Sequence, residues 1–288
     1  MSNQANKIAY YPGCSLHASS KLYDIQCRLV LSRLGITLQE IENWNCCGAS
    51  AANAVDDFLA FALSARNLGI AAASGLSEMI IPCSSCYSRT MIAQQKLFSD
   101  SAFKDAVNAE LVQKVQNPIK ISNILEVLVR HAANISQKAM RQLSSLKPVC
   151  YYGCLLTRFP CEMKVADTIE NPTSMEMLCE FIGAQPIDWN YKTDCCGAST
   201  AITDPKQADL LMSKIVDDAI ARGANCFVTS CPLCQLNLDA YQAKLSKTQK
   251  QLPVYFITEL VGFAMGIDAQ EMQVDRHLTE AMTLLNSK

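Results

Sequence analysis

Two adjacent cysteines followed by Gly-Ala-Ser occur twice in this chain of 288 residues, at 45–50 and at 194–199. Each pair has a single cysteine upstream and a Cys-x-x-Cys motif downstream, so ten of the 15 cysteines form two matching sets of five. The first set is Cys14, Cys46, Cys47, Cys83 and Cys86, and the second set is Cys154, Cys195, Cys196, Cys231 and Cys234. We expect the fold to bring the five cysteines of each set together.

The segments around these cysteines repeat as well. Lys-Ile-Ala-Tyr-Tyr-Pro-Gly-Cys at 7–14 resembles Pro-Val-Cys-Tyr-Tyr-Gly-Cys at 148–154, and Ile-Ile-Pro-Cys at 80–83 resembles Val-Thr-Ser-Cys at 228–231. Equivalent cysteines lie roughly 140 to 150 residues apart, which indicates duplication of a domain-sized unit. We therefore expect two domains, 1–146 and 147–288, with a linker near 144–148.

Short apolar segments alternate with longer segments of helical periodicity in both halves. This alternation predicts an α/β fold with a mainly parallel sheet flanked by helices in each half. The expected strands are 7–12, 78–82, 149–153, 185–189, 226–230 and 253–257, and a short extended segment is expected around 36–41. The expected helices are 20–34, 55–74, 84–98, 101–116, 122–143, 173–182, 205–222, 233–246, 258–265 and 269–286.

The cysteines favour an iron–sulfur cofactor. In each half the single cysteine and the Cys-x-x-Cys motif follow an expected strand and precede an expected helix, where ligands collect and helix N-termini favour thiolates. We expect Gly48 and Gly197 to let the backbone approach inorganic sulfide. Five thiolates per half exceed the four ligands of a structural zinc site. Iron–sulfur clusters are therefore the first interpretation, and zinc in one half is the alternative.

Five cysteines have no counterpart in the opposite half: Cys27, Cys150, Cys161, Cys179 and Cys226. We expect them to be small core residues, because a free cysteine behaves as a small apolar side chain.

The histidines are considered for proton transfer. His17 lies three residues after Cys14 and is a candidate proton donor to a departing thiolate. The alternative is an ordinary hydrogen-bonded histidine. His131 and His277 are expected at surface positions of helices.

Basic residues near the second set offer a second candidate role. Arg158, Lys164 and Lys192 flank these cysteines; the default interpretation of each is a solvated surface charge, and the alternative is that they attract an anionic substrate.

The bulk composition excludes several classes of protein. A formal net charge of −2 and a pI near 6.0 provide no basic surface for nucleic acid. Residues 1–7 lack the apolar core of a secretory signal, and no run of 18 apolar residues predicts a transmembrane helix. We therefore expect a cytoplasmic protein, whose cysteines serve metal or redox chemistry.

The motif set resembles the cysteine-rich CCG domain, and the whole chain resembles the catalytic B subunit of heterodisulfide reductase and its bacterial relatives. The resemblance covers about 7–265 and rests on ten cysteines in register. The resemblance also includes the segments Tyr-Tyr-Pro-Gly-Cys-Ser-Leu at 10–16, Trp-Asn-Cys-Cys-Gly-Ala-Ser at 44–50, Cys-Leu-Leu-Thr-Arg at 154–158, Asn-Pro-Thr-Ser-Met at 171–175 and Ser-Cys-Pro-Leu-Cys-Gln at 230–235. In the second half, 40 residues precede the Cys-Cys pair and 34 follow it, a slight departure from the family spacing.

The resemblance implies two Rossmann-like CCG domains, each holding a non-cubane 4Fe–4S cluster through its five cysteines. The clusters would face each other across the domain interface, with a disulfide between them and one sulfur on an iron of each cluster. One electron from each cluster would cleave the S–S bond, and the reverse reaction would form it. Electrons would come from a ferredoxin-like C subunit, supplied by a flavin-containing A subunit.

Two other functions fit the same cysteines. The chain also resembles CCG-containing subunits of quinone-linked oxidoreductases, which transfer electrons or dock to membranes. The apolar stripe of the expected helix 269–286 would then lie on a bilayer or on a partner. A non-enzymatic module stabilised by zinc is the third alternative.

Overall fold

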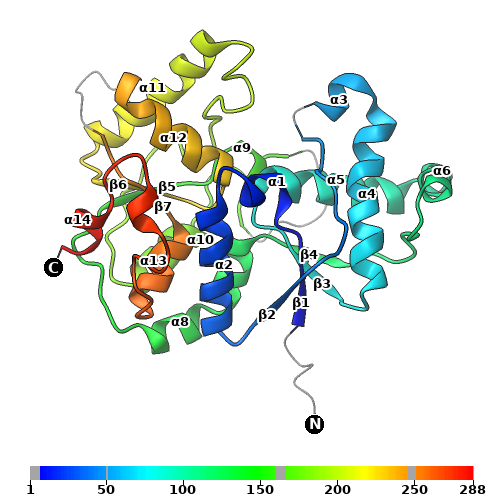
Figure 1. Ribbon diagram of the computed structural model, residues 1–288. Helices are drawn as coiled ribbons and strands as arrows, with labels where there is room; N and C mark the ends of the chain where they lie inside the picture. Colours follow the sequence, from blue (N-terminus) through cyan, green and yellow to red (C-terminus); the bar gives the residue numbers. More distant parts are fainter. Residues whose placement is uncertain (1–6, 50, 160–166, 246–250, 288) are drawn as a thin grey trace.

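The computed structural model describes residues 7–49, 51–159, 167–245 and 251–287. Its two halves each contain a parallel sheet flanked by helices, and they lie side by side (Figure 1). The expected α/β class, with two Rossmann-like units, is confirmed.

The sheet of the first half consists of β1 (Lys7–Tyr10), β2 (Thr37–Glu40), β3 (Glu78–Ile80) and β4 (Lys120–Ser122). All neighbours are parallel, in the order β2-β1-β3-β4. Strand β4 was not expected, because its Lys-Ile-Ser sequence has only one apolar residue. It forms because Met79 of β3 pairs with Ile121, which places that apolar side chain in the core.

The sheet of the second half consists of β5 (Pro148–Tyr151), β6 (Cys226–Thr229) and β7 (Val254–Phe256), all parallel and in that order. The expected strand at 185–189 is wrong, although this segment lies beside β5 and Ile187 N donates to Pro148 O at 2.8 Å. Two features interrupt the ladder there. Pro186 has no N–H, and the Trp189 indole occupies the Cys150 carbonyl at 2.9 Å.

Helices flank both sheets. In the first half they are α1 (Gly13–His17), α2 (Lys21–Arg33), α3 (Ala52–Val55), α4 (Asp57–Ala73), α5 (Ser84–Ser99), α6 (Ser101–Glu110), α7 (Ile124–Arg130) and α8 (Ala132–Lys138). In the second half they are α9 (Cys154–Thr157), α10 (Ser174–Phe181), α11 (Pro205–Ala221), α12 (Pro232–Leu245), α13 (Ile257–Ala264), the 3-10 helix η1 (Val274–Arg276) and α14 (Met282–Leu285). None of the helices in the described ranges is long and apolar enough to cross a membrane.

Two expected helices are shorter than their periodicity indicates. The helix expected at 101–116 ends at Glu110, because the Asn108 side chain accepts a hydrogen bond from Val115 N at 2.8 Å and holds the following loop against the helix. The helix expected at 122–143 begins only after β4 and breaks at His131 into α7 and α8. Its start is fixed by a capping box between Asn123 and Glu126.

The expected C-terminal helix at 269–286 is wrong. Backbone groups that would form it are engaged elsewhere: the Asp239 carboxylate accepts from Leu278 N at 2.8 Å and Thr279 N at 2.9 Å, and Tyr255 Oη donates to Ala281 O at 2.5 Å. The segment is therefore folded onto the second half, and only η1 and α14 are helical. The apolar stripe is divided accordingly, with Met272 buried and Leu278 exposed.

One hydrophobic core spans both halves, and a second cluster of buried residues lies within the second half. Helix α2 of the first half packs on α13 of the second (Figure 1). At this contact the rings of Tyr23 and Phe256 stack with centroids 3.9 Å apart. Gln26 donates to Glu259 at 2.7 Å, and both side chains are fully buried. Separating the halves would expose this apolar and polar surface together.

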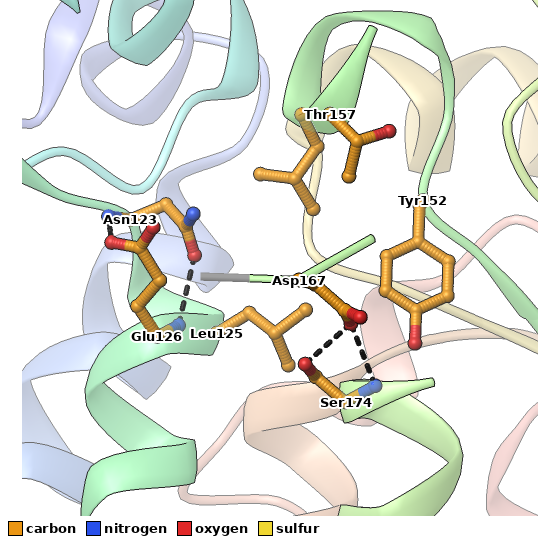
Figure 2. A pocket seen from close by; sticks show the side chains of 8 residues that line it. Asn123, Leu125, Glu126, Tyr152, Thr157, Asp167 and Ser174 are labelled. Atoms are coloured by element: carbon orange, nitrogen blue, oxygen red, sulfur yellow. Dashed lines mark hydrogen bonds between the residues drawn. The ribbon is translucent and has the colours of Figure 1, made fainter. Parts of the chain in front are cut away.

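A small cavity of about 20 Å³, lined by apolar and polar side chains, lies at another part of the junction, between α7 and the second half (Figure 2). Figure 2 shows Asn123 capping Glu126 on one side, and Asp167 accepting from Ser174 on the other. Tyr152 lies along its wall. These polar groups are satisfied within the protein, so the cavity is a structural joint between the halves.

Candidate cysteine site

The structure brings the first set of cysteines together at the carboxyl ends of β1, β2 and β3. Cys14 lies in α1 directly after β1, and Cys83 is the N-cap of α5. The Cys46 and Cys14 sulfurs are 3.6 Å apart, and those of Cys86 and Cys47 are 3.3 Å apart.

The second set has the same pairing. The Cys196 and Cys234 sulfurs are 3.9 Å apart, and the Cys154 thiol lies close enough to Cys195 to lower the pKa of the Cys195 thiol. In both halves, therefore, the upstream cysteine meets the first member of the Cys-Cys pair, and the last cysteine meets the second member. Both sets also open in the same sense: Cys14, Cys46, Cys154 and Cys195 reach solvent, whereas the other six are buried.

Matching hydrogen bonds hold the two Cys-Cys-Gly loops. Tyr11 Oη donates to Asn45 O at 2.8 Å, and Tyr151 Oη donates to Asp194 O at 2.6 Å. Each tyrosine lies at the end of the first strand of its half and anchors the residue before the cysteine pair. The amide after each pair donates to the sulfur of the pair's first cysteine, at 3.5 Å from Gly48 and 3.3 Å from Gly197.

Sequence reasoning missed the glycine that precedes each upstream cysteine. A Cβ on Gly13 would lie 2.8 Å from the Cys86 sulfur, and one on Gly153 would lie 2.9 Å from the Cys234 sulfur. Both glycines have positive φ angles, +75° and +68°. The signal was present in the sequence, because Gly-Cys occurs at the same point in both halves.

The expected role of Gly48 and Gly197 needs correction. These two glycines have positive φ and face helices rather than a sulfur cradle, because a Cβ at Gly48 would meet Ala52 at 2.6 Å and one at Gly197 would meet Ala208 at 2.7 Å. They allow the Cys-Cys-Gly loop to turn closely against the helix that follows it.

The thiols differ strongly in acidity. A hydrogen bond from Cys46 lowers the pKa of Cys47 to about 3, while the same contact raises the pKa of Cys46. In the second set, hydrogen bonds from Cys154 and Cys234 lower the pKa values of Cys195 and Cys231 to about 6. Each set thus places readily ionised thiols beside thiols that keep their protons. Bound cations would stabilise further thiolates there.

The two sets adjoin the junction between the halves. Helix α1, which carries Cys14, packs against α12 of the second half, and α9, which carries Cys154, packs against α5 of the first half. A cavity of about 50 Å³ is lined by Cys154, Cys195, Cys196, Cys231 and Cys234, and also by Ser84 and Ser85 of the first half. Both halves therefore contribute to the surroundings of the second set.

The remaining cysteines separate cleanly from the two sets. Cys27, Cys150, Cys179 and Cys226 are fully buried, which confirms them as core residues, and Cys161 lies outside the described residues. All 14 cysteines in the described ranges are free thiols.

His17 and the basic residues have defined partners. His17 Nε2 lies 3.1 Å from Glu40 Oε1, and its ring packs edge-on against Trp44. Arg158 pairs with Glu170 at 2.7 Å, and Lys164 lies outside the described residues. The default interpretation of Lys192 as a solvated surface charge is wrong, because its ammonium group is buried 2.9 Å from the Glu176 carboxylate.

His277 was also placed wrongly at the surface. Its side chain is 1% exposed, and Nε2 lies 2.8 Å from the buried Glu259 carboxylate. The mistake follows from the missing C-terminal helix, since η1 turns this side chain inward.

The donor set suits a thiolate-bound cofactor. Sulfur pairs at 3.3 to 3.9 Å, the close approach of the Cys86 and Cys234 sulfurs to Gly13 and Gly153, and a repeated amide-to-sulfur bond all fit a sulfur-rich group. Within the described ranges, no three His, Cys, Asp or Glu side chains are arranged to hold a single metal ion. The assignment of the ten cysteines as ligands stays a prediction.

The CCG cysteine-rich domain matches residues 8–90 and 149–239, which together make up more than half of the chain. The chain therefore belongs to the CCG domain family and contains two copies of the domain. Both copies include all five cysteines of their set, in agreement with the expected resemblance.

Two relatives of the chain are subunits of reductases. The 8-methylmenaquinol:fumarate reductase membrane anchor subunit of Wolinella succinogenes is 33% identical, over 96% of this chain and 99% of that protein. The B subunit of the ferredoxin:CoB-CoM heterodisulfide reductase of Methanosarcina mazei is 24% identical, over 97% of this chain and 96% of that protein.

A solved structure shares the fold. A hypothetical protein from Helicobacter pylori superposes on 96% of this chain with a TM-score of 0.77 and 15% identity. The present chain spans 52% of the length of that protein. At this level of identity the likeness shows the fold alone.

Proposed function

We propose that this chain is the iron–sulfur component of a multisubunit oxidoreductase that cleaves or forms a disulfide, or transforms another small sulfur substrate. The observation that carries the proposal is the cysteine cavity lined from both halves, because a substrate there would contact the second set of cysteines directly and would also contact Ser84 and Ser85, which lie between Cys83 and Cys86 of the first set. The 24% identity to the B subunit of a heterodisulfide reductase, over nearly the whole chain, supports the same chemistry.

The ten cysteines would hold two non-cubane 4Fe–4S clusters, Cys14, Cys46, Cys47, Cys83 and Cys86 in one half and Cys154, Cys195, Cys196, Cys231 and Cys234 in the other. When bound, these clusters would supply one electron each to an S–S bond, which becomes two thiols on uptake of two protons. Tyr11 and Tyr151 would keep the cysteine loops in register with the first strand of each sheet. His17 holds its ring between Glu40 and Trp44 beside Cys14, and from there would donate a proton.

Partners follow from this chemistry. Two electrons per disulfide must reach the chain, and a ferredoxin-like C subunit and a flavin-containing A subunit are the proposed source. A cytoplasmic location suits thiols that stay reduced. We also propose that the two CCG domains meet near residue 147, where the chain passes from α8 to β5.

A second function is favoured by the 33% identity to a component of a quinol:fumarate reductase. Here the chain would dock to a membrane, and its two clusters would carry electrons between a quinol and a partner, without a sulfur substrate. Docking through an apolar C-terminal helix is not part of this alternative, since residues 268–287 are folded onto the second half.

Anaerobic purification followed by iron, sulfide and zinc analysis tests the cofactor, and electron paramagnetic resonance of the oxidised protein with and without thiols tests the substrate. We expect about eight irons per chain and a thiol-dependent signal, since thiolates bind cluster iron directly. Colourless, zinc-loaded protein would overturn the cluster assignment. Two loaded clusters that do not respond to thiols but are reduced by a menaquinol would instead select the electron-transfer function.

A further inference from the structure

The N-terminus of α5 has no side-chain cap. Its N-cap residue, Cys83, has an extended backbone, and the Cys83 side chain accepts no hydrogen bond from the first amides of the helix. The first amides of this 16-residue helix belong to Ser84 and Ser85, and a helix start carries partial positive charge. By contrast, α4, α6 and α11 begin with aspartate caps at Asp56, Asp100 and Asp204.

Ser84 also has an unused hydroxyl. The residue is 1% exposed, and its Oγ forms no hydrogen bond of normal geometry within the described part of the chain; the acceptor that it approaches is the Cys231 thiol of the second half. Other hydroxyls of α5 are satisfied inside the helix: Ser88 Oγ donates to Ser85 O at 3.2 Å, and Thr90 Oγ1 donates to Cys86 O at 2.7 Å. A buried polar group without a partner is uncommon, so Ser84 calls for a ligand.

The surroundings of Ser84 indicate the chemistry of that ligand. Ser84 and Ser85 line the cavity that also holds the five cysteines of the second set, with Leu155 and Leu233 supplying apolar wall. None of the described residues that line it is a lysine or an arginine. A hydroxyl and uncapped amides are hydrogen-bond donors and favour an electron-rich acceptor. The candidate acceptors at this cavity are sulfur atoms, because five cysteines line it.

We propose that Ser84 and Ser85 at the start of α5 form a binding site of the first half for an anionic sulfur atom in the cysteine cavity of the second half. This inference rests on the proposed function, which supplies the sulfur either as cofactor sulfide and thiolate or as substrate thiolate. Ser84 and Ser85 are positioning residues in this scheme. Hydrogen bonds to cluster sulfurs are one of the ways in which proteins set cluster potentials, so the first half would tune the electron affinity of the second.

The test compares Ser84→Ala with the conservative Ser84→Thr and with Ser88→Ala as matched control. Ser88 is buried on the same helix, but its hydroxyl is bonded inside the helix. Iron content is measured first, followed by the midpoint potentials of both clusters without thiol, and then by the thiol concentration that half-saturates the thiol-dependent resonance signal.

If the acceptor is cofactor sulfur, Ser84→Ala makes reduction of one cluster about tenfold less favourable, a shift of about 59 mV to lower potential for one electron. If it is substrate sulfur, the potentials stay and thiol affinity falls about tenfold. Ser84→Thr and Ser88→Ala keep wild-type values in either case. Unchanged potentials and unchanged thiol affinity in iron-loaded Ser84→Ala overturn this inference alone, as does a Ser84→Thr variant that behaves like Ser84→Ala. A wild-type protein without iron overturns the proposed function instead.

Discussion

Gly13 and Gly153 each leave room for the last cysteine sulfur of their own set. The positive φ angle and the short distance to sulfur each favour glycine at both positions. Any side chain would strain the backbone and would also displace the sulfur. The ten cysteines could be singled out from the sequence because the spacing within each set, and the repetition of the set, are visible in the order of the residues. The sulfur contacts of these glycines depend on how strand, loop and helix meet, and so they appear only in three dimensions.

Replacing Gly153 should damage one site and spare the other. A Cβ there would lie 2.9 Å from Cys234 Sγ at a φ of +68°, so we expect Gly153→Ala to lose about half of the bound iron and about 1–3 kcal/mol of folding free energy. Iron analysis and urea unfolding measure the two effects. Gly223→Ala is the control, because Gly223 has a φ of +80° but nothing within 4 Å of its added Cβ. Equal iron loss in both variants would contradict the sulfur contact.

At the scale of elements, the C-terminal segment shows where periodicity misleads. Residues 269–286 have apolar residues at helical spacing, yet Asp239 and Tyr255 hold their backbone in another path. The strand at 185–189 failed for a similar reason, because the Trp189 indole replaces a backbone donor. Helices α2, α5, α10 and α11 were predicted nearly in full, since their apolar periodicity and packing agree.

The His277–Glu259 pair should make stability depend on pH. Burial opposes the charge on His277, but Glu259, Asp239 and Asp275 outweigh it and raise the pKa of His277. A raised histidine pKa gives stability that is complete below the unfolded value of about 6.5 and is lost as the pH rises through the folded value. In urea unfolding, the advantage of the wild type over His277→Gln should therefore shrink above about pH 6.5. A difference that stays constant with pH would contradict a protonated His277.

At the scale of the whole molecule, the hydrophobic core that both halves share determines how the halves are joined, and the duplication alone does not reveal it. The repeat predicted two domains, and two sheets are indeed present, but no feature of the chain's order indicated that Tyr23 would stack on Phe256 or that Gln26 would meet Glu259. Such contacts join residues more than 200 positions apart, and no local pattern encodes them.

We expect the two halves to fold together. A fragment of residues 1–146 would expose α2 with Tyr23 and Gln26, and the complementary fragment 147–288 would expose Phe256 and Glu259. Circular dichroism during urea titration should show no cooperative transition for either fragment alone, and co-expression should restore one. The intact apoprotein should unfold in a single transition. Cooperative unfolding of 1–146 alone would show that the halves are independent.

The crossed packing of α1 on α12 and of α9 on α5 has an evolutionary consequence. When the residues of each duplicated domain contact only residues of the same domain, the two domain sequences can diverge independently. In this protein the helix that carries the upstream cysteine of each copy, α1 or α9, packs on a helix of the other copy. A substitution in either copy therefore also affects packing against the other copy. Among proteins that descend from the same duplication, we therefore expect substitutions in α1 to correlate with substitutions in α12. We expect the same for α9 and α5.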